Sequence, residues 1–245
     1  MIKISGKHQV SIFGEFSDIV PTSETILSIL NSFKGKDFIP GTVREIAKIG
    51  TGNEIRLQLA TQNKEWLVNF LTNRIDIEKN PIEGDGDNIG NIQNFVEEAV
   101  DICKRIIKAF KIKSYRLSLI TTGMLDDMNS SKLDAIYIKL FNPISYYRKN
   151  IPFEWNFRTG ANTEITIKNK KERLNVLTSL NRIHGLIIHQ DVTQNFDRIE
   201  IQFDINTTHE NKNQRFNINS IIEFLNQAIE IRTQLITDIK EHINV

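Results

Sequence analysis

The sequence predicts an α+β fold of two similar halves, each running strand, helix, antiparallel meander and long helix. The first observation behind this is the motif Arg-Ile-Asp-Ile at 74–77, which returns 128 residues later as Gln-Phe-Asp-Ile at 202–205. The second is the long helix pattern that follows each motif after a polar loop, with apolar positions that match at an offset of 129. The matching pairs are Phe95/Phe224, Ala99/Ala228 and Ile106/Leu235. An internal repeat of this kind constrains the architecture of a chain.

The expected halves are residues 1–112 and 113–245. No linker rich in glycine and serine lies near Lys111-Ile112-Lys113, so we expect the halves to pack together as one compact unit. Their sheets are expected to be either continuous or packed side by side.

The first half begins with an alternating strand at 8–13, in which Val10 and Ile12 share a face. Thr22 or Ser23 can cap a helix that ends near Gly35. A strand-rich meander follows, with strands at 42–49, 55–59, 66–70 and 75–77 and turns at 50–53 and 62–64. A polar loop at 80–91 then leads to a helix over 92–111.

The second half repeats this order. A strand at 115–120 precedes a helix that Ser130 or Ser131 can cap and that carries an apolar stripe. Alternation predicts five further strands, at 153–158, 164–168, 173–180, 183–189 and 198–205, before a C-terminal helix over 219–242. Antiparallel meanders bury one face, so the two long striped helices are the expected covers.

The composition is that of an ordinary globular protein of 245 residues, with 40% hydrophobic and 25% charged residues. Lys and Arg total 31 against 30 Asp and Glu, and this balance argues against nucleic acid as a partner. No apolar run reaches the roughly 18 residues of a membrane span, and the N-terminus lacks a signal-peptide pattern. With Cys103 as its single cysteine, the chain is expected to be cytoplasmic and to bind no membrane.

Two acidic segments come closest to metal chemistry. The loop 83–90 resembles a calcium loop that starts at Asp85, but Ile89 and Val96 stand where oxygen ligands are needed. Asp204, Glu210 and Lys212 have the residue types of a metal-dependent nuclease, yet the segment 207–214 reads as a solvated loop. We therefore expect no metal and no cofactor.

Other reactive or conspicuous residues have structural interpretations. Cys103 lies on the apolar stripe of its helix, where a small core residue is the default. Trp66 and Trp155 fall within predicted strands. The basic cluster of Lys168, Lys170, Lys171 and Arg173 is expected to surround a hairpin turn.

The pattern Ile199-Glu-Ile-Gln-Phe-Asp204-Ile205, with its following loop and helix and the meander from Trp66 to Asp76, resembles a known family. That family is a large, sporadically distributed bacterial group of proteins of about 250 residues without an assigned function. Members of such families sometimes accompany mobile or antiphage defence genes. The resemblance therefore implies a connection with defence, and it transfers no catalytic residue.

No catalytic constellation emerges from the spacing of the residues, so the expected function is non-enzymatic. We expect a protein-binding component that contacts another protein or a second copy of itself, as a sensor or adaptor subunit of a bacterial antiphage defence system. One alternative is a metal-dependent nuclease or other hydrolase with a site assembled from distant residues. A second alternative is a small-ligand-binding module in the groove between the halves.

Overall fold

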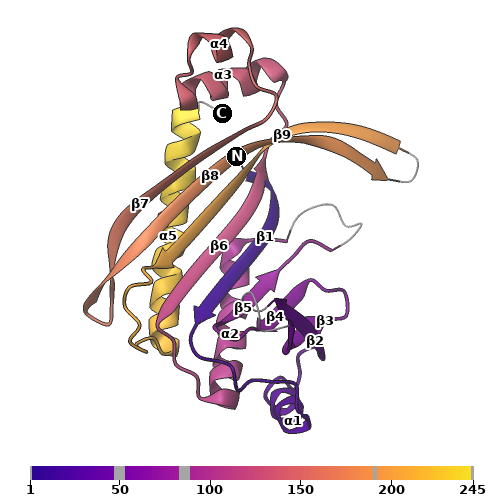
Figure 1. The fold of residues 1–245 in the computed structure, drawn as a ribbon, viewed down its shortest axis with the longest axis vertical. Helices are drawn as coiled ribbons and strands as arrows, with labels where there is room; N and C mark the ends of the chain where they lie inside the picture. Colours follow the sequence, from indigo (N-terminus) through magenta and orange to yellow (C-terminus); the bar gives the residue numbers. More distant parts are fainter. Residues whose placement is uncertain (1, 47–52, 83–88, 190–191, 244–245) are drawn as a thin grey trace.

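A computed structural model describes residues 2–46, 53–82, 89–189 and 192–243. Its strands are β1 (Ile2–Phe13), β2 (Phe38–Ile46), β3 (Asn53–Thr61), β4 (Trp66–Phe70), β5 (Arg74–Lys79), β6 (Arg116–Leu125), β7 (Trp155–Ile167), β8 (Lys170–His189) and β9 (Val192–Thr207). They form one antiparallel sheet with the order β2-β3-β4-β5-β1-β6-β9-β8-β7 (Figure 1). The β1–β6 pairing joins residues on both sides of the expected boundary at 112/113.

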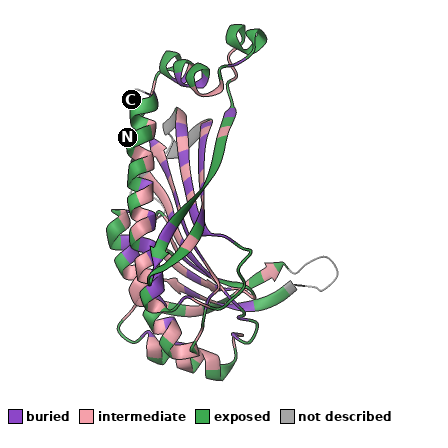
Figure 2. Ribbon diagram, turned by 90° about the vertical axis from the view of Figure 1, so that its left-hand side faces the viewer, coloured by how far each residue is buried: buried purple, intermediate pink, exposed green. Residues whose placement is uncertain are grey.

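The helices are α1 (Ser23–Ser32), α2 (Ile92–Phe110), α3 (Ser130–Phe141), α4 (Ser145–Lys149) and α5 (Ile218–Ile243). α2 packs against β1 and β5, and α5 packs against β6, β7 and β9, all from the same side of the sheet (Figure 2). α1 contacts α2, and α3 and α4 lie beyond the opposite end of the sheet (Figure 1). None of the helices within the described ranges is both long and apolar enough to cross a membrane.

Short polar side chains cap the starts of α1, α2 and α3, and left-handed residues end two of these helices. Thr22 caps α1 by accepting a hydrogen bond from the Thr25 amide (3.2 Å), as predicted. α3 is capped by Asn129, which accepts from the Lys132 amide (2.9 Å), and not by the predicted Ser130 or Ser131. Lys111 ends α2 and Asn142 ends α3 with positive φ angles.

The core lies between the helix-bearing face of the sheet and the two long helices. Val10 and Ile12 of β1 face this core, as predicted from their alternation. Phe95 and Phe224, the predicted core residues of the two long helices, are both completely buried. Burial also raises the pKa of the Cys103 thiol to about 12, so that it remains a protonated core residue at neutral pH.

The prediction of two similar strand–helix–meander–long helix halves is wrong. The described residues form a single nine-stranded sheet with five helices. The two motif aspartates also occupy different registers: Asp76 lies directly opposite Ser11, whereas Asp204 lies opposite Ile120. The matching stripes misled because any helix that covers the same apolar sheet face needs apolar residues at helical spacing.

The second correction concerns the later strands, which are fewer and longer than predicted. The segments at 153–158 and 164–168 merge into β7, and those at 173–180 and 183–189 merge into β8. β8 continues through the predicted break because it pairs with β7 over residues 170–182 and with β9 over residues 174–189.

A buried histidine lies in the core beside α2. The Nδ1–H of His8 donates to the Lys7 carbonyl (2.9 Å). Its ring lies 5.3 Å from that of Phe95, centroid to centroid. Burial, with a further contribution from the positive charge of Arg232, lowers the pKa of His8 from 6.5 to about 4. His8 is therefore neutral in the native protein at pH 7.

We expect acid to destabilise the protein through His8. The unfolded chain binds this proton near pH 6.5 and the native protein only near pH 4, so the free energy of unfolding falls as pH drops through this window. The loss is roughly 3 kcal/mol, since each pKa unit corresponds to about 1.4 kcal/mol. Urea denaturation at several pH values should show a shallower pH dependence for His8→Gln than for the wild type. His209 is exposed, so His209→Gln is the control and should keep the pH dependence of the wild type. If His8→Gln also keeps it, the assignment to His8 is contradicted.

Candidate binding face of the sheet

Both α2 and α5 lie on one side of the sheet, and we call the opposite side the helix-free face (Figure 2). Residues alternate between the two sides along each strand. In β1 and β6, the core residues Val10 and Leu119 therefore alternate with Ser11 and Ser118, which point to the helix-free side. The alternation that builds the core thus also builds the polar face.

One row of this face crosses every strand of the sheet. Each member lies directly opposite the next: Gly41, Gln58, Asn69, Asp76, Ser11, Ser118, Asn206, Asn175 and Asn162. We call these nine residues the polar row. Eight of them carry hydrogen-bonding side chains. With strands about 4.8 Å apart, the row is about 38 Å long.

The centre of the polar row is buried although no helix of the described ranges covers it. Ser11, Asp76, Ser118 and Asn206 are 1–3% exposed. The Ser11 hydroxyl donates to Asp76 Oδ1 (2.6 Å), and the Arg74 Nε–H donates to Asp76 Oδ2 (2.8 Å). Because buried polar groups are costly when unpaired, these contacts hold the side chains in fixed directions.

Hydrogen bonds continue towards both edges of the sheet. Gln58 donates to Asn69 (2.7 Å) on one side. On the other side, Asn162 donates to Asn175 (2.7 Å), which donates in turn to Asn206 (3.1 Å). The row is therefore largely pre-organised, and its amides offer both donors and acceptors.

Charges of both signs flank the polar row. Arg116, Arg158 and Arg74 lie on the helix-free face together with Asp204 and Glu78. The guanidinium of Arg116 stacks on the ring of Phe13, 4.6 Å from its centroid. Mixed charge of this kind differs from the dense positive surface that binds a phosphate backbone.

The residues of the nuclease hypothesis have separate environments. Asp204 lies on the helix-free face, where its Oδ1 accepts from Ser118 and Asn206 (both 2.9 Å). Glu210 is fully exposed, and a hydrogen bond from Thr208 lowers its pKa. The ammonium of Lys212 lies over the ring of Tyr115 (4.9 Å). Within the part of the chain that the structure describes, no three His, Cys, Asp or Glu side chains are grouped as a metal site.

The other residues that the sequence singled out lie in different parts of the structure. Residues 83–88 of the calcium-like loop, including Asp85, lie outside the described residues. The basic cluster does surround a hairpin turn, at Lys168 and Asn169, both of which have positive φ. Trp66 lies in β4 and stacks on Phe95, and Trp155 begins β7, so both tryptophans are in strands as predicted.

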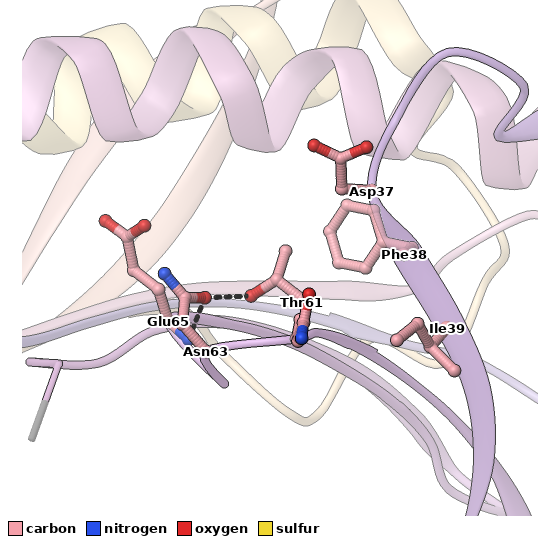
Figure 3. A pocket seen from close by; sticks show the side chains of 7 residues that line it. Asp37, Phe38, Ile39, Thr61, Asn63 and Glu65 are labelled. Atoms are coloured by element: carbon pink, nitrogen blue, oxygen red, sulfur yellow. Dashed lines mark hydrogen bonds between the residues drawn. The ribbon is translucent and has the colours of Figure 1, made fainter.

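A separate hollow of about 750 Å³ lies at the edge of the sheet where β2 and β3 meet the turn after β3 (Figure 3). Asp37 and Glu65 contribute carboxylates to its lining. The Thr61 hydroxyl donates to Asn63 (2.8 Å), and Asn63 accepts from the Glu65 amide (3.1 Å). These polar side chains stabilise the turn, which accounts for their position at the hollow.

Sequence reasoning missed the polar row. Six of its nine members sit between apolar neighbours, as in Val10-Ser11-Ile12 and Leu117-Ser118-Leu119, and this signal is visible in the sequence. The alternation shows that such residues leave the core, but it does not show which strands are neighbours. The row exists only through the strand order and register of the sheet.

Comparison with known proteins supplies no relative for this arrangement. No protein-family model, curated protein or solved structure matches the chain, so the resemblance to a sporadic bacterial family stays a prediction.

Proposed function

We propose that the protein is a non-enzymatic binding component that holds another protein against the helix-free face of its sheet. The observation that carries this proposal is the polar row, continuous over nine strands and buried at its centre. A face that only meets water does not need fixed polar side chains. A binding face gains from them, because side chains that are already ordered lose less entropy when a partner arrives.

The dimensions and charges of the face favour a protein partner. A row about 38 Å long exceeds a small molecule and suits the roughly 800 Å² that one partner buries in a standard protein interface. Interspersed Arg, Asp and Glu can pair with the mixed charges of a protein surface. The connection with antiphage defence rests on the family resemblance alone and stays a prediction.

A matched pair of arginine substitutions tests the proposal. Gln202 is half-buried on the helix-free face, between Ser179 and Thr122, and makes no hydrogen bond with the described residues. Asn226 is exposed on the outer side of α5. We expect Gln202→Arg to lose proteins that the wild type captures from its native cells and Asn226→Arg to keep them, as measured by quantitative mass spectrometry.

The captured protein is then purified and its affinity measured with each variant. Loss of a buried interface contact typically weakens binding by about tenfold or more. Equal affinities for Gln202→Arg and Asn226→Arg would move the interface away from the helix-free face. Chemical cross-links between the captured protein and α5, instead of β9, would also place the interface away from the helix-free face.

A further inference from the structure

A cavity of about 370 Å³ opens on the helix-free face where β7, β8, β9 and β6 lie side by side. Its lining includes Arg116, Arg158, Gly160, Asp204 and Asn206. Gly160 leaves part of the space open, since it has no side chain. A Cβ at this position would lie 3.4 Å from Leu177, which is an ordinary contact.

Two guanidinium groups line this cavity with donors to spare. The Arg116 Nε–H donates to the Thr207 carbonyl and its Nη2–H donates to Asn206 Oδ1, both at 3.1 Å. These bonds and the Phe13 ring fix the guanidinium while Nη1 remains without a hydrogen bond to the described residues. Arg158 is exposed and makes no hydrogen bond or ion pair within the described ranges. Guanidinium groups recognise carboxylates through directional, charge-assisted hydrogen bonds.

The cavity also holds one carboxylate, that of Asp204. Asp204 Oδ1 accepts from Ser118 and Asn206, and its Oδ2 accepts from none of the described residues. A bare phosphate, negative on every side, would be repelled by this carboxylate. A carboxylate carried on a peptide differs, because the N–H groups of the same peptide can donate to Asp204.

From this combination we propose that the cavity holds an acidic side chain of the bound protein. The carboxylate of that side chain contacts Arg116 and Arg158, and an adjacent main-chain N–H donates to Asp204. This inference rests on the proposed function. It specifies that the bound protein carries an acidic side chain where it contacts this end of the helix-free face.

Two blocked amino acids isolate this chemistry. N-acetylglutamate N-methylamide and N-acetylglutamine N-methylamide have the same shape and differ in the side-chain charge. We expect the glutamate probe, and not the glutamine probe, to shift the NMR signals of the Arg116 and Arg158 side chains. Arg158→Gln should weaken binding of the glutamate probe by roughly tenfold or more, the usual consequence of losing a charged hydrogen bond.

A pair of glycine variants tests the location. Gly160→Val fills the cavity, whereas Gly41→Val places the same side chain in open space at the opposite end of the polar row. Valine suits a strand, so both variants should fold, which thermal melts can verify. Glutamate binding should disappear in Gly160→Val and persist in Gly41→Val.

Several results would overturn the inference. They are an equal response to the glutamine probe, a stronger response to inorganic phosphate, retained binding in Gly160→Val, and no response up to about 50 mM probe. The proposed binding function is tested separately from the acidic-side-chain site. If Gly160→Val still captures the partner and Gln202→Arg does not, the binding face stands without the acidic-side-chain site.

Discussion

Replacing Phe95 with alanine is expected to lower the free energy of unfolding by roughly 3–5 kcal/mol. The ring is completely buried and stacks on Trp66, with centroids 5.5 Å apart and an interplanar angle of 13°. It also lies against His8. Alanine would remove this apolar surface and leave a cavity between α2 and the sheet. Chemical denaturation of the purified variant measures the loss.

Two comparisons make the Phe95 result interpretable. Phe224 is equally buried on α5, so Phe224→Ala should cost a similar amount. Phe153 is 70% exposed, and Phe153→Ala should cost less than about 1 kcal/mol. A Phe95→Ala loss as small as that of Phe153→Ala would mean that the core between α2 and the sheet is wrongly described.

Replacing Arg56 with methionine is expected to cost roughly 3–5 kcal/mol. The Arg56 side chain is 2% exposed. Its three nitrogens donate to the carbonyls of Phe70 (3.2 Å), Ser17 (2.9 Å) and Phe16 (2.5 Å). Methionine fills a similar volume but provides no donor, so these carbonyls and the nearby Glu45 carboxylate would lose their partner.

Lysine at the same position should not restore stability. Its ammonium is a single centre, and it cannot reproduce three hydrogen bonds that leave a planar fork in different directions. The control is Arg44→Met, at an exposed residue of β2, where a change within about 0.5 kcal/mol is expected. If Arg56→Lys unfolds at the same denaturant concentration as the wild type, the directional bonding of the guanidinium is unimportant.

Arg56 also shows how a residue can be misjudged from its sequence context. In Ile55-Arg56-Leu57-Gln58-Leu59 it reads as the polar, solvated side of a half-buried strand. The strand is correct, and Leu57 and Leu59 are buried as the alternation requires. Arg56 is nevertheless buried, because the loop after β1 runs over its end of the sheet and brings the carbonyls of Phe16 and Ser17 to it.

The candidate site also combines a feature that the sequence predicts with one that only the tertiary structure decides. The sequence indicates that Ser11, Ser118 and Asp76 leave the core, since each stands between apolar neighbours in a strand. Their meeting depends on β1 lying between β5 and β6, strands that are far apart in the sequence. Nothing local encodes that order. The cavity beside Gly160 depends further on the long β7–β8 pairing, which the predicted interruptions hid.

By itself, the sequence determined much of the local structure: strands within β1 to β5, the two long helices predicted at 92–111 and 219–242, and the buried rings of Phe95 and Phe224. Alternation and helical spacing are local consequences of burying apolar surface, so they can be read along the chain. Only the tertiary structure decided that the strands join one sheet and that its helix-free face carries the polar row. Strand order and register are set by contacts between segments distant in sequence, and repeated apolar stripes fit more than one such arrangement.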